Sequence, residues 1–193
     1  MSKDRFYKNL ADHVQRLLDD GDLAFADPVL SEICKVFHGA VFRRSSIMDG
    51  FCHFVVDVIK PSGKCCFEIG TFNGLTAIVL SRYFDDVYSV DIEQSNIKKY
   101  QIIKHFGIKN VHFLGAENNV KKKELADSID FDYAYIDGNH VDDTLIDFDM
   151  VKRCGNVMFH EYWPKQPAVY DLVNSLPKEE VTIVNNFAYW KKA

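Results

Sequence analysis

Residues 65–74 of this 193-residue chain read Cys-Cys-Phe-Glu-Ile-Gly-Thr-Phe-Asn-Gly, an apolar stretch that ends on an acid and two glycines. The apolar residues predict a strand, and the apolar run over 75–84 predicts a helix packed on a sheet. Two glycines between a strand and a helix form an elbow of the kind at which bound nucleotides are held. An ordinary tight connection would contain the same glycines, so other residues must decide between these interpretations.

Phe72 and Glu68 indicate which ligand the elbow would accept. A dinucleotide site has a glycine where this chain has Phe72, because the backbone must approach a pyrophosphate there. Glu68 would place negative charge beside any phosphate. Both residues therefore disfavour NAD and ATP, and they favour a cationic ligand without phosphate, such as the sulfonium S-adenosylmethionine.

The pattern Glu68-x-Gly70-x-x-x-Gly74 resembles the first motif of class I S-adenosylmethionine-dependent methyltransferases. The resemblance implies cofactor contacts from Glu68, Gly70, Thr71, Phe72 and Gly74.

Two further strand ends extend the predicted cofactor site. Asp91 ends the strand predicted over 87–91, about 20 residues after the elbow, where a Rossmann-type site places the acid that binds ribose hydroxyls. A helix cap or a solvated loop acid would also explain Asp91. The resemblance places Ile92 against one face of the adenine, and it places Ala116 and Glu117, after the strand 111–114, under the ring and beside its exocyclic amine.

The fourth and fifth predicted strands, 131–136 and 155–159, run into Asp137-Gly138-Asn139-His140 and His160-Glu161-Tyr162-Trp163. These two segments resemble a subgroup of small-molecule O-methyltransferases that includes sugar and antibiotic-tailoring enzymes and, more distantly, catechol O-methyltransferase. The resemblance covers residues 64–163. It implies O-methylation of a small hydroxylated acceptor, such as a sugar, by in-line displacement.

A hydroxyl acceptor must lose its proton, and a histidine can accept it near neutral pH. We expect His140 to be the base, with His160 as the second choice and Asp137 as a catalytic carboxylate. For any single histidine, a structural hydrogen bond that holds a loop is the more common role. Tyr162 and Trp163 would either face the acceptor or pack on the N-terminal helices.

A second hypothesis gives Asp137, His160 and Glu161 to a divalent metal ion. The resemblance implies it, because related metal-dependent enzymes bind magnesium at the corresponding strand ends, normally through two oxygen donors in the later pair. A nitrogen ligand from His160 would favour zinc, iron or manganese over magnesium. Consecutive side chains in a strand point in opposite directions, so His160 and Glu161 converge only if the strand has already bent.

These residues need a parallel sheet that brings several strand ends to one rim. The segments 181–184 and 187–190, joined by two asparagines, predict a C-terminal hairpin. The resemblance implies an α/β, three-layer Rossmann-like fold with a seven-stranded, mostly parallel sheet in the order 3-2-1-4-5-7-6. We expect a single methyltransferase domain over 1–193, with a catalytic core over 63–193.

The first 62 residues predict a helical extension that would help to enclose the acceptor, with helices over 4–19, 28–37 and 46–59. Another helix is predicted over 95–106 and a last one over 168–176. Arg43 and Arg44 in the extension would either contact an anionic substrate or be exposed.

Composition limits the classes of function. A hydrophobic content of 47% can fill such a sheet, and a net charge of -5 gives no electrostatic footprint for nucleic acid. The one basic run, Lys121 to Lys123, predicts a solvated helix face. The five cysteines are an odd number without metal-binding spacing, so we expect reduced thiols in a cytoplasmic protein without membrane contact. A homo-oligomer is compatible with the sequence.

Two other functions fit the same pattern. The fold could serve as a non-catalytic adenosyl-binding or partner module, although the set Glu68, Gly70, Gly74 and Asp91 argues against a lost pocket. The chain could also be an NAD-dependent oxidoreductase with a degenerate glycine elbow.

Overall fold

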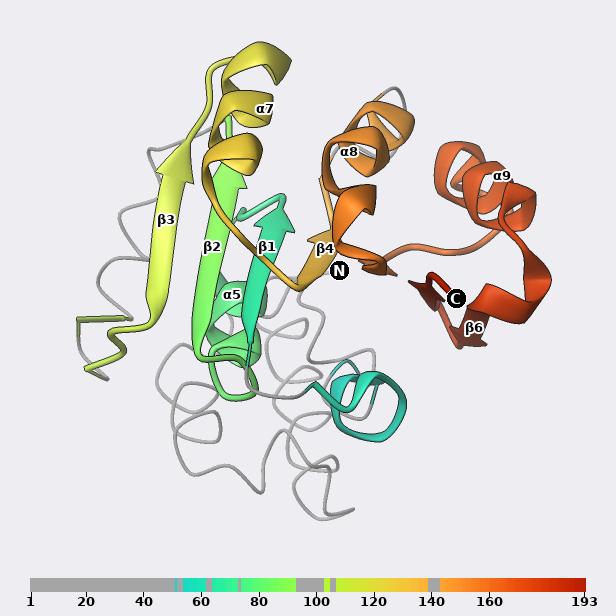
Figure 1. The fold of residues 1–193 in the computed structure, drawn as a ribbon, viewed down its shortest axis with the longest axis horizontal. Coiled ribbons are helices and arrows are strands. Elements are labelled where there is room, and N and C mark those ends of the chain that lie inside the picture. Colours follow the sequence, from blue (N-terminus) through green and yellow to red (C-terminus); the bar gives the residue numbers. More distant parts are fainter. Residues whose placement is uncertain are drawn as a thin grey trace, which may run out of the picture.

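The computed structural model describes residues 51, 54–61, 64–72, 74–92, 103–104, 107–138 and 143–193. In this part of the chain, one seven-stranded sheet has the order β3-β2-β1-β4-β5-β7-β6 (Figure 1). The strands are β1 (Cys65–Ile69), β2 (Asp86–Asp91), β3 (Val111–Gly115), β4 (Tyr133–Ile136), β5 (Asn156–Phe159), β6 (Val181–Val184) and β7 (Phe187–Lys191). The predicted strand order and the C-terminal hairpin are confirmed.

The strand directions decide what gathers at each edge of the sheet. The first five strands are mutually parallel, whereas β7 is antiparallel to both β5 and β6. Parallel strands bring their carboxyl ends to one rim, where an α/β sheet holds its ligands. In the antiparallel pair, Phe159 at the end of β5 faces Ala188 at the start of β7. The β6–β7 turn therefore lies at the same rim.

Two separate cores cover the two faces of the sheet. Side chains alternate along β1, so Cys66 packs with one core while Phe67 and Ile69 pack with the other. Cys65 is partly buried against the second core, so the two adjacent cysteines point to opposite faces as predicted. The near-continuous burial of β1 is typical of a parallel strand covered on both sides.

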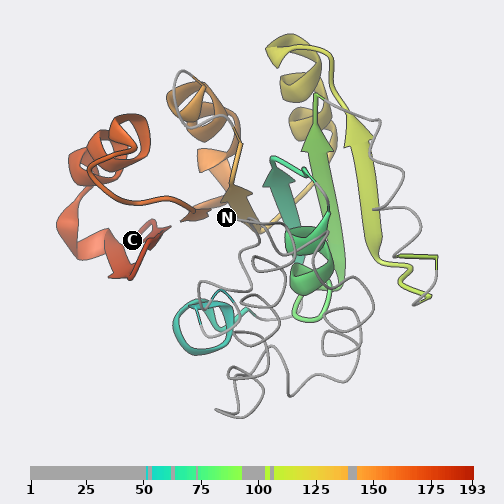
Figure 2. The ribbon, with the colours of Figure 1, turned by 180° about the vertical axis from the view of Figure 1, so that it is seen from behind.

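Helices form the outer layers. The π-helix η3 (Phe54–Ile59) and α5 (Leu75–Leu80) contribute to one core, and α7 (Asn119–Ser128), α8 (Thr144–Val151) and α9 (Pro167–Ser175) contribute to the other. Figure 2 shows α5 and η3 from behind the view of Figure 1. Short 3-10 helices η4 (Lys152–Cys154) and η5 (Lys178–Glu180) precede β5 and β6. Among the described residues, no helix has the length and apolarity needed to cross a membrane.

Several boundaries differ from the sequence predictions. The helix after the elbow ends at Leu80 instead of residue 84, because the backbone there tightens: Arg82 N donates to the Val79 carbonyl at 3.0 Å and Tyr83 N to the Leu80 carbonyl at 2.9 Å, each three residues back. The fourth strand begins at Tyr133 instead of Phe131, whose ring stacks on Phe67. The helix α8 was not predicted from the sequence.

Other predictions fall partly or wholly outside the described residues. The predicted helices over 4–19 and 28–37, and Arg43 and Arg44, lie outside them entirely. Of the predicted helix 46–59, residues 51 and 54–59 are described, and the latter form η3. Of the predicted helix 95–106, only residues 103–104 are described.

The prediction of a solvated face for Lys121 to Lys123 is wrong for its middle residue. Lys122 is only 7% exposed, and its Nζ donates to Asp147 Oδ1 of α8 at 2.6 Å. Ala126, one helical turn later, is also buried, because residues four apart share one helix face. Lys121 and Lys123 instead pair with Glu124 and Asp127 at the surface.

Candidate active site

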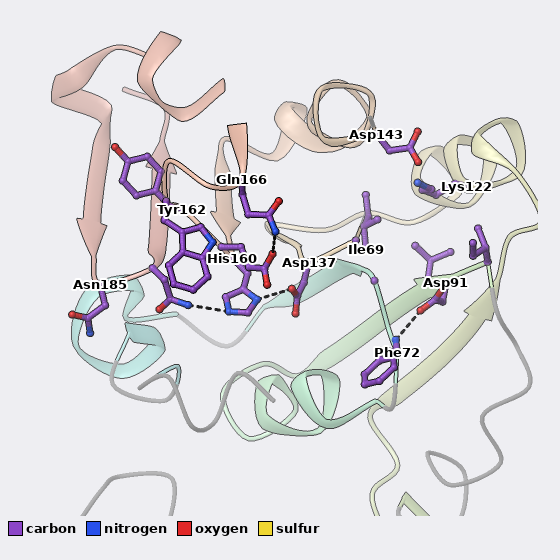
Figure 3. Close-up of a pocket in the computed structure, with 17 residues that line it drawn as sticks. Ile69, Phe72, Asp91, Lys122, Asp137, Asp143, His160, Tyr162, Gln166 and Asn185 are labelled. Carbon is purple, nitrogen blue, oxygen red and sulfur yellow. Dashed lines mark hydrogen bonds and ion pairs between the residues drawn. The ribbon is translucent and has the colours of Figure 1, made fainter. Parts of the chain in front are cut away.

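A pocket of about 1090 Å³ lies at the rim where the parallel strands end (Figure 3). Its walls come from the segments after β1, β2, β4 and β5 and from the β6–β7 turn. The residues predicted for cofactor, catalysis or metal that line it are Gly70, Phe72, Asp91, Ile92, Asp137, His160 and Glu161. Tyr162 and Trp163 also line it. The tertiary structure thus brings residues from four strand ends into one cavity.

The elbow after β1 needs glycine for a steric reason. Gly70 has φ +103°, and a Cβ built there would lie 2.2 Å from the carbonyl oxygen of Asp137. The chain leaving β1 therefore passes directly against the chain leaving β4, and Asp137 N donates to the Ile69 carbonyl at 2.8 Å. Gly74, with φ +78°, occupies the N-cap position of α5. Backbone packing alone thus requires a glycine at position 70.

Asp91 fastens the elbow to the end of β2. The Phe72 N–H donates to Asp91 Oδ2 at 2.7 Å, and Phe72 itself has a left-handed φ of +44°. Phe72 and Ile92 are 64% and 69% exposed, so each presents apolar surface beside the pocket. The acid predicted to bind ribose hydroxyls therefore lies at the pocket wall, where it already accepts a bond from the elbow backbone.

Glu68 lies beneath the elbow rather than at the pocket wall. It is fully buried, and it pairs in register with Ser89 of β2, whose hydroxyl donates to Glu68 Oε2. The Thr71 hydroxyl is hydrogen-bonded to the same Ser89 hydroxyl at 2.7 Å. Glu68 and Thr71 therefore support the elbow from inside the fold, and their predicted contacts with a cofactor stay predictions.

The remaining predicted cofactor residues do not line the pocket in this structure. Ala116 is buried, and its N–H donates to the Asp91 carbonyl at 2.9 Å. Glu117 is exposed beyond the end of β3. Their proposed contacts with adenine, and that of Gly74 with the cofactor, stay predictions.

At the other end of the pocket, His160 is held by three neighbours, and Figure 3 shows its side chain pointing at that of Asp137. Its Nδ1 is hydrogen-bonded to Asp137 Oδ1 at 2.7 Å, and its Nε2 is 3.1 Å from Asn186 Nδ2. Its ring stacks on Phe187, with ring centres 5.1 Å apart. His160 is only 8% exposed. The strand-four acid and the strand-five histidine therefore form a pre-assembled pair, whereas His140, the first choice as base, lies outside the described residues.

Asp137, His160 and Glu161 do not fit a shared metal ion as they are arranged. Both ring nitrogens of His160 are engaged, by Asp137 and by Asn186. The chain does bend after β5, since Glu161 has φ +57°, but its Oε2 accepts a bond from Gln166 Nε2 at 2.8 Å. Within the described part of the chain, no group of three acidic, histidine or cysteine side chains could hold a metal ion.

Several polar residues that line the pocket were not predicted from the sequence, namely Lys122, Asp143, Gln166, Asn185 and Asn186. The signal for Asn186 was the direction of β7: an antiparallel partner of β5 must start at the rim where β5 ends. The sequence indicated the burial of Lys122 more weakly, because Lys122 precedes the apolar Ala126 by four residues and would share its helix face.

Known proteins resemble this chain in structure rather than in sequence: no protein-family model and no curated protein matches it. An O-methyltransferase from Bacillus cereus in complex with S-adenosylhomocysteine matches with TM-score 0.67 and 16% identity, covering 96% of this chain and 100% of the other. A methyltransferase from Podospora anserina with bound S-adenosylhomocysteine matches with TM-score 0.60 and 15% identity, covering 94% and 95%. An rRNA methylase from Streptococcus thermophilus matches with TM-score 0.54 and 16% identity, covering 80% and 100%.

These similarities extend over almost the whole length of the matched chains, which include enzymes with different acceptors. At such low identity a shared structure establishes the fold, while the acceptor must be argued from the site. The chain therefore has the Rossmann-like fold of S-adenosylmethionine-dependent methyltransferases, with their strand order of 3-2-1-4-5-7-6.

Proposed function

We propose that this protein is an S-adenosylmethionine-dependent methyltransferase that methylates a hydroxyl group of a small acceptor. The observation that carries the proposal is the hydrogen-bonded pair of Asp137 and His160, in the same pocket as the glycine elbow and Asp91. One end of the pocket suits an adenosyl group, and the other carries a base for an acceptor hydroxyl.

The cofactor end fits a ligand without phosphate. Asp91 offers a carboxylate at the pocket wall, and hydroxyl groups of a ribose are donors that such a carboxylate accepts. Glu68 places an acidic side chain under the elbow, where a pyrophosphate would need donors; once ionised, its carboxylate would repel phosphate and attract a cation. Gly70, Phe72, Asp91 and Ile92 would hold the adenosyl group. When bound there, S-adenosylmethionine supplies a methyl group on a sulfonium, which an acceptor oxygen attacks in line as the C–S electron pair stays on sulfur.

At the acceptor end, this chain supplies proton transfer and alignment. His160 accepts the hydroxyl proton on Nε2, while the carboxylate of Asp137 holds Nδ1 and stabilises the imidazolium that forms. A positioned base of this kind contributes about 10²–10⁴-fold to rate, and alignment of the two reactants contributes further.

The walls around His160 support a neutral, polar acceptor such as a sugar or a hydroxylated ring. Trp163 is 47% exposed and offers a flat apolar surface, and Gln166, Asn185 and Asn186 offer amides. The same wall carries the carboxylates of Asp137 and Glu161. Negative charge at this end disfavours an anionic acceptor, because like charges in a partly buried site repel.

Calorimetric titration with S-adenosylmethionine and S-adenosylhomocysteine tests the cofactor. We expect micromolar-range binding by the wild type and a clear loss in Asp91→Ala. Asp91→Asn separates the two roles of this residue, because an amide oxygen can still accept from the Phe72 N–H but has lost the charge. Asp127→Asn, at an exposed acid of α7, is the matched control.

Turnover is tested by measuring S-adenosylhomocysteine release with panels of hydroxylated acceptors. We expect His160→Gln to reduce kcat strongly while S-adenosylmethionine still binds. Binding without turnover of any acceptor would instead support a non-catalytic adenosyl-binding module. Tight binding of NADH with no heat from S-adenosylmethionine would overturn the proposal in favour of an oxidoreductase.

A further inference from the structure

We propose that Asn186, in the β6–β7 turn, is a positioning residue that holds His160 in one tautomer, with its proton on Nδ1 and its lone pair on Nε2. Asn186 does not belong to any of the strand ends that supply the predicted site residues. It reaches His160 from 26 positions later in the chain.

The hydrogen bonds around the imidazole are directional. Ionised Asp137 can only accept, so the 2.7 Å bond to it requires a proton on Nδ1 of His160. In a neutral ring Nε2 is then an acceptor, and it needs a donor. The amide nitrogen of Asn186, 3.1 Å from Nε2, is that donor. Asp137 and Asn186 thus select the same tautomer from opposite sides of the ring.

The backbone holds Asn186 in place for this role. The Tyr162 N–H donates to the Asn186 carbonyl at 2.8 Å, which ties the turn to the segment just after His160. Asn185 adopts φ +55°, the left-handed conformation that a tight hairpin turn requires. Phe187, the next residue, stacks on the His160 ring. One short turn therefore fixes the ring plane, the ring position and the hydrogen-bond direction together.

The catalytic consequence rests on the proposed function. A base must present its lone pair where the acceptor hydroxyl arrives, and both His160 and Asn186 line the pocket. The amide of Asn186 occupies Nε2 in this arrangement, and the acceptor hydroxyl would take over that bond. Its proton then passes to Nε2, while the bond from Nδ1 to Asp137 persists. Pre-organisation of the ring avoids a search among tautomers in each turnover.

Asn186→Asp tests the inference with a side chain of the same shape and inverted hydrogen-bonding capacity. A carboxylate can only accept, so it would require a proton on Nε2 as well. We would label the histidines isotopically, assign His160 by its absence in His160→Gln, and read both ring nitrogens by NMR near neutral pH. We expect one protonated nitrogen, Nδ1, in the wild type, and two in Asn186→Asp.

Two further variants serve as controls for this test. Asn185→Asp adds the same charge one residue earlier, at a side chain for which no hydrogen bond to His160 is observed, and it should leave His160 protonated on Nδ1 alone. Asn186→Ala removes the donor without adding charge. In this variant the resonance of His160 Nε2 should shift to the position typical of an imidazole nitrogen that accepts no hydrogen bond. Circular dichroism and melting temperature would show that each variant is folded.

The spectra decide the inference independently of turnover. A wild-type His160 protonated on Nε2, or wild-type ring resonances retained in folded Asn186→Asp, would overturn it even if the protein is a methyltransferase. Conversely, the expected spectra would support it even if no acceptor is turned over. With an active acceptor, Asn186→Asp should lower kcat by about tenfold or more with unchanged affinity for S-adenosylhomocysteine. An unchanged kcat would also overturn the positioning role.

Discussion

Replacing Gly70 by alanine is expected to separate two strand ends that the fold holds in contact. The added Cβ would lie 2.2 Å from the carbonyl oxygen of Asp137, 2.5 Å from its carbonyl carbon and 2.7 Å from the backbone nitrogen of Gly138. All three atoms belong to the backbone, so no side-chain rotation can relieve the overlap. The segments after β1 and β4 must move apart instead.

Two effects set the magnitude. The φ of +103° at Gly70 lies outside the regions that alanine adopts readily, and such strain costs about 1–3 kcal/mol. Forcing extra atoms into a packed site costs about 1–3 kcal/mol more. Together they reduce the free energy of unfolding by about 2–6 kcal/mol, a large part of the roughly 5–15 kcal/mol typical of a domain. Near the middle of this range, the melting temperature should fall by roughly 10 °C.

Urea and thermal unfolding of Gly70→Ala, with two matched controls, would measure this loss. Gly107 has φ +62°, and among the described residues other than its chain neighbours no atom lies within 4 Å of a built Cβ, so Gly107→Ala isolates the conformational strain. A Cβ built on Gly138 would lie 3.4 Å from Asp147 Oδ2 and from an Ile69 methyl carbon, which is ordinary van der Waals contact, and the φ of Gly138 is not positive. The stability of Gly138→Ala therefore reports the effect of an added methyl group in contact with its neighbours, without backbone strain.

We expect Gly70→Ala to lose clearly more stability than both controls combined, because only its Cβ overlaps backbone atoms. A stability within about 1 kcal/mol of Gly107→Ala would refute it, because strain alone would then account for the loss. If Gly70→Ala keeps its stability but loses affinity for S-adenosylmethionine, the glycine is there for the ligand rather than for the close passage of two strand ends.

Three further predictions concern the buried charges, the thiols and metal dependence. Lys122→Met should destabilise the protein by about 3–5 kcal/mol in urea unfolding, since it leaves Asp147 buried without its cation, whereas the double change with Asp147→Leu should recover much of the loss. Lys123→Met, at an exposed pair, should cost under about 1 kcal/mol, and an equal cost for both single variants would contradict the burial of Lys122. Burial raises the pKa of Cys154 to about 11 from 9.0, and burial followed by the charge of Glu68 raises the pKa of Cys66 well above its usual value. As the pH rises, the thiols therefore ionise in the unfolded chain before they ionise in the folded protein. The free energy of unfolding should keep its full value below about pH 9 and decrease between about pH 9 and pH 11. Melting curves at a series of pH values check this, and the decrease should be smaller in Cys154→Ala. Methyl transfer should persist after treatment with EDTA, and a loss of activity that one divalent ion restores would revive the metal-dependent hypothesis.

Apolar runs and turn residues located the strands and the hairpin in the sequence, whereas the strand order came from the resemblance to class I methyltransferases. The apolar runs ending in Glu68-Ile69, Asp91 and Ile136-Asp137 located the strands, because buried parallel strands are apolar along their whole length. The Asn185-Asn186 pair located the hairpin. Boundaries were less exact: Phe131 belongs chemically to a strand, yet it turns onto Phe67 just before β4 begins.

The sequence by itself determined which residue types stand at the carboxyl ends of the strands, and hence that Gly70, Asp91, Asp137 and His160 would meet at one rim. That inference succeeds because a parallel sheet maps strand ends onto a single edge. The tertiary structure alone decided that Glu68 lies beneath the elbow, that Lys122 is buried against Asp147, and that Asn186 reaches the His160 ring. These outcomes depend on strand register, on helix rotation and on side chains that meet across 21 to 26 positions of chain. Local sequence patterns do not encode such contacts, because packing between elements sets them.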